Sequence, residues 1–368
     1  MSPVERIGAE ESDGQSHRKR VTIREVARAS GVSATTVSVV LNGTAAHVGI
    51  REATRRSVLR NANRLGYTPN RAARSLRWQR TNVLMLLVQD LANPWFIDLA
   101  VAARTTAVAR GYELNIVDAG PFEAEMRALG HLRGGSADAV IVATGRHGSR
   151  AAALDALQDL VEHGVPAVML IDRSPDPQIP AIRVDVEGGA YRATRHLLQL
   201  GHRRIGHLTL AGAEPIESEV SSRGERYRGY RRALSTMDVA FDTAWLIEGR
   251  DSLAGGRTML QALLALGERR PSAILVYNDL TAIGAMHGLY EAGLRIPEDM
   301  AVIGTDGIEL GAYTTPPLTS VEHPGARLGQ LAIETAIDLL GGSVPAETDR
   351  VLETRLIVRA SCGGGSPV

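Results

Sequence analysis

The sequence predicts a small all-α domain followed by a larger α/β core with two lobes. Three observations lead to this fold class. Two short helical patterns joined by a tight turn lie within residues 22–42, strands and helices alternate from Thr81 onward, and positive charge is concentrated near the N-terminus. Strands that alternate with helices are typical of parallel sheets covered by helices on both faces.

The stretch from residue 22 to 42 predicts a helix-turn-helix. Thr22 and Glu25 have the spacing of a capping box, Gly31 permits a tight turn, and Ser33 can cap a second helix. In the second helix Val37, Val40 and Leu41 are expected to face inward, and the small, uncharged outer face consists of Ala34, Thr35, Thr36, Ser38 and Val39. Hydroxyl and methyl groups suit the base edges of a DNA major groove, although an ordinary buried helical hairpin has the same two helices.

The charge distribution favours the DNA-binding interpretation. The whole chain has a net charge of zero, but residues 17–80 carry fourteen Lys and Arg against two Glu, a net charge of +12. Residues 1–16 carry −3, so the rest of the chain carries −9. A strongly basic segment on a mildly acidic body is typical of a nucleic-acid-binding domain.

Composition indicates a globular, cytoplasmic protein. Hydrophobic residues make up 44% of the chain and charged residues 22%, no apolar run approaches the roughly 20 residues of a membrane span, and the polar N-terminus lacks the apolar region of a signal peptide. The single cysteine, Cys362, excludes disulfide frameworks and cysteine-pair metal sites. We expect neither a metal nor a cofactor.

The domain boundaries follow from changes of pattern. Residues 1–20 are expected to be a disordered tail, 21–68 the helix-turn-helix domain with a third helix at about 51–65, 69–80 a linker, 81–362 the core, and 363–368 a tail. Buried strands are predicted at 83–88, 113–117, 139–142, 167–171, 204–210, 273–277 and 301–304, with helices near 95–110, 151–163, 187–200, 225–237, 253–267, 280–292 and 325–341. Strands resume after Asp185 as a second unit, so two lobes with a cleft between them are predicted.

Polar and aromatic residues follow the predicted strands, where ligands of parallel sheets bind. They are Asp90 with Asn93, Pro94, Trp95 and Phe96; Asp118; Asp172 with Arg173; Asn278 with Asp279; and Asp306. Carboxylates, an amide and arginines beside a Trp-Phe pair suit a polyhydroxylated small molecule. Some of these residues, such as Asp90 and Asp279, have the alternative role of capping the helix that follows.

Several ordered phrases of the sequence resemble the LacI (lac repressor) family of bacterial transcription regulators over about residues 20–362. These are VTIREVARASGVSATTVSVVLNG and REATRRSVLRNANRLGYTPNRAARSL in the N-terminal domain, and NPWF, VDVEGG, HLLQLGHRRIGHL, RYRGYRRAL, YNDLTAIGAMHGLYEAGLRIPEDMAVIGTDG, PPLTSV and RLIVRAS in the core. The resemblance implies a homodimeric repressor with a hinge helix after the helix-turn-helix domain. It also implies a periplasmic-binding-protein-like core that binds a small effector, commonly a sugar.

The resemblance assigns roles to individual residues. Ser33, Thr36 and Ser38 match phosphate or groove contacts and Ala34, Thr35 and Val39 match base-reading positions, while Thr22 and Asn42 complete the expected contacts in this domain. Residues 70–76 match the hinge helix, with contacts expected from Asn70, Ala73 and Leu76, the last at the position of a leucine that wedges into the minor groove. The expected effector-binding residues are Trp95, Phe96, Asp172, Arg226, Asp251, Asn278, Asp306 and His323.

The same resemblance predicts the lobes and the partners. The first lobe is expected to comprise about residues 81–184 and 323–343, and the second about 185–322 and 344–362. We expect a pseudo-palindromic double-stranded operator, a carbohydrate effector, no membrane, and a location on the nucleoid. Since the C-terminus has no leucine heptads, we expect a homodimer and not a tetramer.

Five positions depart from the family pattern. Val39 replaces a common arginine, and a methyl contact to thymine is the physical replacement. Arg51 stands where a serine cap is frequent, Val186 replaces a common asparagine, and Gly307 a common acid. Asp251 lies near a position that is aromatic in some sugar-binding members. The last three leave the identity of the effector open.

Two other function classes fit less well. A sugar-binding component of a transporter would share the core, but it would have a signal peptide and would not have the +12 segment. An enzyme would need a catalytic motif, and the sequence has no G-x-G-x-x-G, G-x-S-x-G or H-E-x-x-H, while its one lysine, Lys19, lies in the N-terminal tail. His202 and His207 flank a strand and are expected to be structural. We therefore predict a DNA-binding regulator that is not an enzyme.

Overall fold

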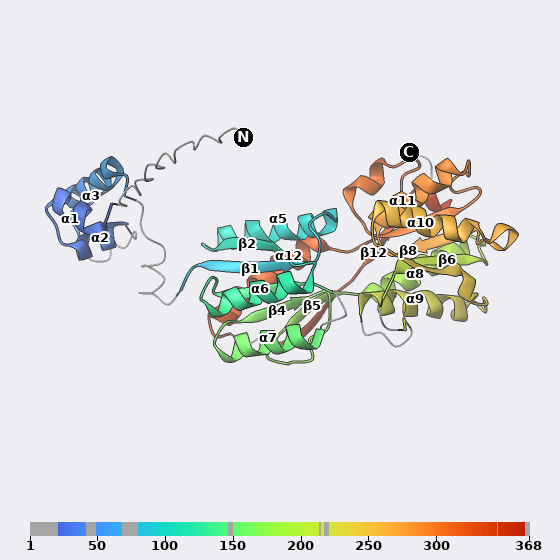
Figure 1. Cartoon of the computed structure of the whole chain (residues 1–368), viewed down its shortest axis with the longest axis horizontal. Helices are drawn as coiled ribbons and strands as arrows, with labels where there is room; N and C mark the ends of the chain where they lie inside the picture. The colour runs from blue at the N-terminus through green and yellow to red at the C-terminus, as the bar shows by residue number, and fades with distance from the viewer. Residues whose placement is uncertain are drawn as a thin grey trace, which may run out of the picture. The chain divides into compact units, whose positions relative to one another are not determined.

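A computed structural model of the 368-residue chain describes residues 21–41, 49–67, 80–145, 150–212, 215–216, 221–343 and 345–364. The chain forms two compact units, Met1–Arg80 and Thr81–Val368 (Figure 1). The predicted N-terminal tail, Asn42, and the hinge residues Asn70, Ala73 and Leu76 lie outside the described residues. None of the described helices is long and apolar enough to cross a membrane.

The first unit contains the predicted helices α1 (Ile23–Ser30), α2 (Ala34–Leu41) and α3 (Glu52–Leu65). They enclose a small apolar core in which Val26, Val37 and Val58 are completely buried, one from each helix. The Glu25 carboxylate accepts hydrogen bonds from the backbone N–H and the hydroxyl of Thr22, so the start of α1 is fixed as the sequence predicts. Gly31 ends α1 with φ 65°, a left-handed conformation that favours glycine.

The second unit contains two six-stranded sheets. The first sheet has the order β11-β5-β4-β3-β1-β2, and all its pairings are parallel. Its strands are β1 (Val83–Val88), β2 (Glu113–Asp118), β3 (Ala139–Ala143), β4 (Ala167–Leu170), β5 (Ala181–Val184) and β11 (Asp349–Leu352). Strands β1, β3, β4 and β5 are buried almost throughout, as expected for a sheet covered on both faces.

The second sheet repeats this pattern with the order β12-β10-β9-β8-β6-β7, in which only the pairing of β12 with β10 is antiparallel. Its strands are β6 (Ile205–Leu210), β7 (Leu246–Gly249), β8 (Ala273–Val276), β9 (Ala301–Asp306), β10 (Thr319–Glu322) and β12 (Arg355–Ile357). The sequence-based expectation of two α/β lobes with parallel sheets is thus confirmed.

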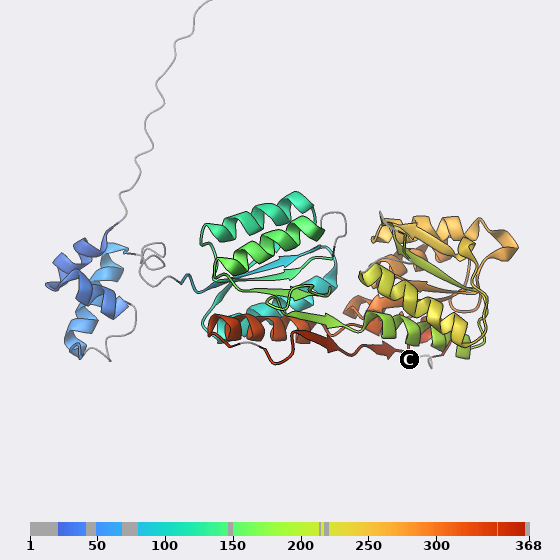
Figure 2. The same ribbon diagram turned by 90° about the horizontal axis from the view of Figure 1, so that it is seen from below.

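Helices cover both faces of each sheet (Figures 1 and 2). On the first sheet α5 (Pro94–Ala109) and α12 (Gly325–Leu340) pack on one face, and α6 (Phe122–Arg133) and α7 (Arg150–Glu162) on the other. On the second sheet α8 (Val186–Gln199) and α9 (Ser222–Thr236) pack opposite α10 (Leu253–Leu264) and α11 (Asp279–Glu291). Short 3-10 helices lie at Thr243–Trp245, Gly267–Arg269, Glu309–Tyr313 and Ala360–Cys362.

The chain crosses between the lobes three times, and the third crossing differs from the expectation. β5 leads into α8 and β10 leads into α12, close to the predicted boundaries. However, β11 pairs with β5 in the first sheet, so the predicted return to the second lobe at residue 344 is wrong. The return lies between β11 and β12, because the hydrogen bonds of β11 belong to the first lobe.

Candidate functional site

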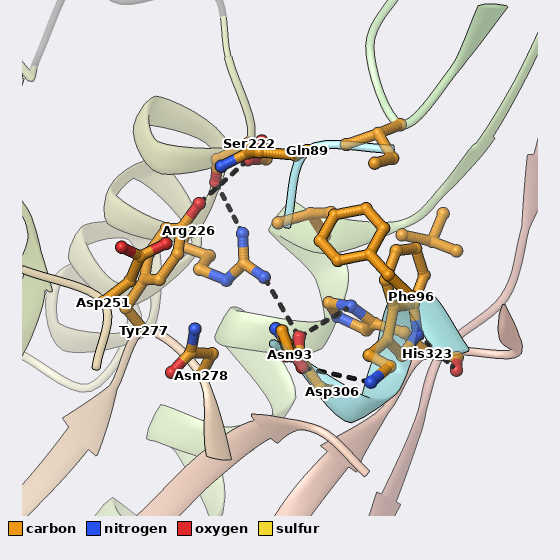
Figure 3. Close-up of a pocket in the computed structure, with 14 residues that line it drawn as sticks. Gln89, Asn93, Phe96, Ser222, Arg226, Asp251, Tyr277, Asn278, Asp306 and His323 are labelled. Carbon is orange, nitrogen blue, oxygen red and sulfur yellow. Dashed lines mark hydrogen bonds and ion pairs between the residues drawn. The ribbon is translucent and has the colours of Figure 1, made fainter. Parts of the chain in front are cut away.

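A cavity lies between the two lobes, where strands of both sheets end (Figure 3). It is lined by Gln89, Asn93, Trp95, Phe96, Ile171, Val184, Val186, Ser222, Arg226, Asp251, Tyr277, Asn278, Asp306 and His323. The structure therefore brings together seven of the eight residues expected to bind an effector. The eighth, Asp172, is buried beside the cavity but does not line it.

Arg226 and Asp306 form the charged centre of the cavity. Arg226 Nη2 lies 3.7 Å from Asp306 Oδ1, and each side chain is 7% exposed. The guanidinium also lies over the ring of Tyr277, 4.3 Å from its centroid. At this distance the face of an aromatic ring attracts a cation. Arg226 Nε has no hydrogen-bond partner among the described residues. The guanidinium is thus held in place while its Nε–H group remains able to donate a hydrogen bond to a ligand.

Asp306 occupies an unusual position. It is the last residue of β9 and has a φ of 110°, which costs energy for a residue with a side chain. Burial raises the pKa of its carboxyl to about 6, whereas Arg226 and a hydrogen bond from Asn93 act in the opposite direction. Strained, poorly solvated carboxylates of this kind are concentrated at functional sites.

His323 lies on the other side of Asp306. Its Nδ1 is 3.6 Å from Asp306 Oδ1, and burial, with a smaller contribution from Arg226, lowers the pKa of the imidazole well below its ordinary value. The ring is therefore neutral at pH 7, and its Nε2 has no hydrogen-bond partner among the described residues. The backbone oxygen of His323 accepts a hydrogen bond from Trp95 Nε1 at 3.2 Å.

Both asparagines that line the cavity also cap helices. Asn93 Oδ1 accepts from the N–H of Trp95 at the start of α5, and Asn278 Oδ1 accepts from the N–H of Thr281 at the start of α11. Asp279 does not cap α11; its carboxylate accepts from the Ser320 hydroxyl and the N–H of Ile308, and burial raises its pKa. Asp90 accepts from the N–H of Ala92 and lies outside the cavity. Capping therefore accounts for part of the polar pattern, but not for the convergence on one cavity.

Sequence reasoning did not assign several residues of the cavity to the site. Gln89 and Tyr277 directly follow β1 and β8, so their position at strand ends was a usable signal. Ser222 opens α9, one turn before Arg226. Ile171 and Val184 are apolar and nothing in their local sequence distinguishes them from core residues, whereas Val186 was singled out only as a departure from the family pattern.

The predicted DNA-contacting residues of α2 are partly exposed. Thr35 and Ser33 are exposed, and Ser33 Oγ accepts a hydrogen bond from the N–H of Thr36 at 3.1 Å, which caps α2 as expected. Thr36 and Ser38 are half-buried. Ala34 and Val39 differ from the expectation of an outward face, because both pack partly against the apolar core of the unit.

Comparison with protein families gives two matches. Residues 22–70 match the bacterial regulatory proteins of the lacI family, and residues 194–362 match a periplasmic binding protein-like domain. The first match covers the helix-turn-helix unit. The second covers most of the second lobe together with α12 and β11 of the first lobe.

Individual relatives match over nearly the whole chain. The HTH-type transcriptional repressor PurR of Aliivibrio fischeri is 33% identical over 86% of this chain and 91% of its own length. The lac repressor dimer bound to operator and the anti-inducer ONPF has a TM-score of 0.78 at 28% identity, covering 94% of this chain and 99% of that chain. The transcriptional regulator CelR in complex with cellobiose has a TM-score of 0.67 at 29% identity, covering 93% and 100%. The chain therefore belongs to the LacI family of DNA-binding transcriptional regulators.

Proposed function

We propose that this regulator is a repressor whose affinity for operator DNA is controlled by a sugar or sugar derivative bound in the cavity between the lobes. The observation that carries the proposal is the buried pair of Arg226 and Asp306 beside Trp95 and Phe96. A carboxylate and a guanidinium can accept from and donate to neighbouring hydroxyls of one sugar ring. The rings of Trp95 and Phe96, with centroids 5.0 Å apart, offer an apolar surface on which the face of a sugar ring can pack.

The charges at the cavity favour an uncharged ligand. Arg226 supplies one positive charge, whereas Asp306 and Asp251 supply carboxylates, and the ring of His323 is neutral because burial lowers its pKa. A phosphate or carboxylate ligand would need excess positive charge at this position. The cellobiose complex of CelR, a relative with the same fold, supports a neutral carbohydrate.

We further propose that the protein acts as a homodimer. On α5, the side chains of Ile97, Val101 and Val108 are 46%, 59% and 60% exposed and lie at helical spacing on one outer face. Ile116 on the neighbouring edge strand β2 is 37% exposed. Apolar side chains gathered in this way mark a surface that another protein covers, and a second copy fits the two-fold operators that helix-turn-helix proteins bind. Such a dimer would act on DNA at the nucleoid.

The proposed mechanism is a two-state equilibrium. In one relative orientation of the lobes the two hinge segments of the dimer pair on the operator, and in the other they separate. An effector changes operator affinity only by its difference in affinity for the two states, and a few kcal/mol is sufficient. Both relief of repression and co-repression are compatible with this equilibrium.

A thermal-shift screen tests the proposal. Purified protein is melted with neutral sugars, polyols, sugar phosphates, nucleosides and purines. A ligand at about 100 times its dissociation constant stabilises the folded protein by roughly 2.7 kcal/mol, which a melt detects. We expect a neutral sugar to raise the melting temperature of the wild type and to have no effect on Arg226→Ala. A shift only with anionic ligands or purines would contradict the carbohydrate assignment.

A further inference from the structure

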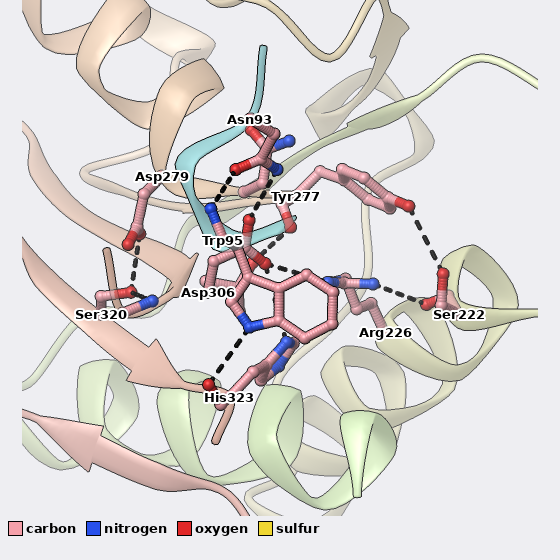
Figure 4. A network of polar contacts seen from close by, with 12 residues as sticks. Asn93, Trp95, Ser222, Arg226, Tyr277, Asp279, Asp306, Ser320 and His323 are labelled. Atoms are coloured by element: carbon pink, nitrogen blue, oxygen red, sulfur yellow. Dashed lines mark hydrogen bonds and ion pairs between the residues drawn. The ribbon is translucent and has the colours of Figure 1, made fainter. Parts of the chain in front are cut away.

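One hydrogen bond across the cavity joins the two lobes directly (Figure 4). Asn93 follows β1 in the first lobe, and its Nδ2 donates to Oδ2 of Asp306, the last residue of β9 in the second lobe, at 3.1 Å. Both partners line the cavity. A bond from a neutral amide to a buried carboxylate is stronger than one between two neutral groups.

Asn93 has a second structural task at the same time. Its Oδ1 accepts the N–H of Trp95 at 3.0 Å, so the same side chain caps α5. Trp95 Nε1 in turn donates to the backbone oxygen of His323, in the segment that links β10 to α12. The start of α5 is thereby attached to the second lobe by Asn93 and to the crossover segment by Trp95.

The two carboxylate oxygens of Asp306 have different surroundings. Oδ1 lies 3.7 Å from Arg226 Nη2 and 3.6 Å from His323 Nδ1, while Oδ2 accepts from Asn93. A ligand hydroxyl that donates to Oδ2 along the lone pair that Asn93 uses therefore competes with the Asn93 amide. Since Asn93 also caps α5, this competition affects the start of the helix that carries the exposed apolar side chains Ile97, Val101 and Val108.

We propose that Asn93 is a positioning residue that latches the lobes together, and that a ligand in the cavity replaces the Asn93–Asp306 bond with a bond of its own. This inference rests on the proposed effector site. Through this contact, a ligand in the cavity would change both the separation of the lobes and the position of the start of α5.

The latch acts together with apolar contacts between the lobes, in which Leu280 and Ile283 of α11 also take part. Ile308, in the second lobe, is 2% exposed and packs in the same cluster as Trp95 and Phe96 of the first lobe. Loss of the latch should therefore loosen the contact between the lobes, while the apolar cluster continues to hold them together. Loss of one hydrogen bond to a charged group shifts an equilibrium between closed and open forms by roughly tenfold or more.

Trp95 provides a probe of this opening, since it lies at the latch and is 7% exposed. In the full chain, Trp78→Phe and Trp245→Phe leave Trp95 as the only tryptophan. Asn93→Ser and Asn93→Asp both keep a good cap for α5 and both remove the amide donor, and Asp adds repulsion against Asp306. Asn278→Ser is the matched control, because Asn278 also caps a helix at the cavity but forms no bond between lobes among the described residues.

The measurement is acrylamide quenching of Trp95 fluorescence at pH 8, without ligand or DNA. We expect the quenching constant to rise at least about twofold in Asn93→Ser, to rise further in Asn93→Asp, and to stay unchanged in Asn278→Ser. Ser and Asp cap a helix about equally well. If Asn93 served only as the cap of α5, the two variants would therefore have similar quenching constants. An unchanged constant in both Asn93 variants, or an equal rise in Asn278→Ser, would overturn the latch. Because no effector is used, either result leaves the proposed carbohydrate site to be judged by the thermal-shift screen.

Discussion

The guanidinium of Arg226 lies 3.7 Å from the carboxylate of Asp306, and both groups are shielded from water between the two lobes. Removal of one partner of a buried ion pair leaves the other as an uncompensated charge. In this pair the carboxyl can escape that cost by taking up a proton, since burial already raises its pKa to about 6. The pair therefore connects the proposed effector site with the stability of the protein and its dependence on pH.

Arg226→Ala should abolish the effector response and spare operator binding, because the change lies in the cavity and not in the first unit. It should also destabilise the protein more at pH 8 than at pH 5. Without the cation the pKa of Asp306 rises further, and a neutral carboxyl at pH 5 tolerates burial. Thermal melts at the two pH values and operator titrations with and without a stabilising sugar measure both effects. A variant that still responds normally would place the effector elsewhere.

Asp306→Asn should flatten the pH dependence of stability. Because the pKa in the folded protein is about 6, above the ordinary 3.8, the folded state binds this proton more tightly than the unfolded state. Its contribution to stability is complete below about pH 3.8 and is lost as the pH rises through 6, a difference of about 3 kcal/mol. Urea unfolding from pH 4 to pH 7.5 should show this loss in the wild type and not in the variant. Asp279, whose pKa is raised by burial and by the charge of Asp306, is present in both proteins, so the variant should keep only the pH dependence that burial of Asp279 causes.

The sequence predicted those features that depend on local pattern. Val37 and Val40, which lie at helical spacing in α2, are buried as predicted, and the strands that are apolar throughout were found because they lie at the centres of their sheets. By contrast, α6 was missed, because Phe122–Arg133 contains a glycine and four charged residues and buries only one side. Edge strands β7 and β12 are short and partly exposed, so they have no continuous apolar run.

The cavity was predictable to the extent that its residues follow strands. The exception is Asp172. The backbone at Ile171 has a φ of 76°, a conformation rare for a β-branched residue, and Ile171 takes the place at the cavity that was expected for Asp172. Nothing in the local sequence indicates such a turn of the chain, since no glycine or asparagine marks it. Contacts between lobes, such as that of Asn93 with Asp306, join residues 213 positions apart and require the fold to be known.

Val101→Asp should weaken the proposed dimer. The side chain is 59% exposed at the middle of the apolar stripe on α5, so a charge there is tolerated in a monomer but not in a covered interface. Sedimentation velocity at micromolar concentration should show a dimer for the wild type and a shift to monomer for the variant. Leu200→Asp, at a site of similar chemistry that is 40% exposed at the end of α8, is the control and should remain dimeric. A tetrameric wild type would contradict the predicted assembly.

Asn61→Ala should loosen the first unit. Asn61 Nδ2 donates to the backbone oxygen of Ala29 and to Ser30 Oγ, both at 3.1 Å, and so ties α3 to the end of α1. Loss of these bonds should cost about 1–2 kcal/mol. Hydrogen exchange of the amides in α1 and α3 should accelerate by about tenfold or more, whereas Asn63→Ala, two positions along on the exposed side of the same helix, should leave it unchanged. Equal effects of the two substitutions would show that helix propensity, and not the bonds of Asn61, controls the unit.

Leu76→Ala should reduce specific operator affinity while leaving weak non-specific binding intact. Leu76 lies outside the described residues, and the prediction rests on its match to the hinge leucine of the family. An apolar wedge contributes only where the duplex is opened at the central step, whereas non-specific binding depends on phosphate contacts. Arg77→Gln, the neighbouring change, removes a charge and should weaken both kinds of binding and reduce their salt dependence. Titrations of an operator selected from random DNA, and of an unrelated duplex, at two salt concentrations separate these outcomes. If Leu76→Ala weakened both duplexes equally, the segment would act through charge or folding, and the hinge assignment would be wrong.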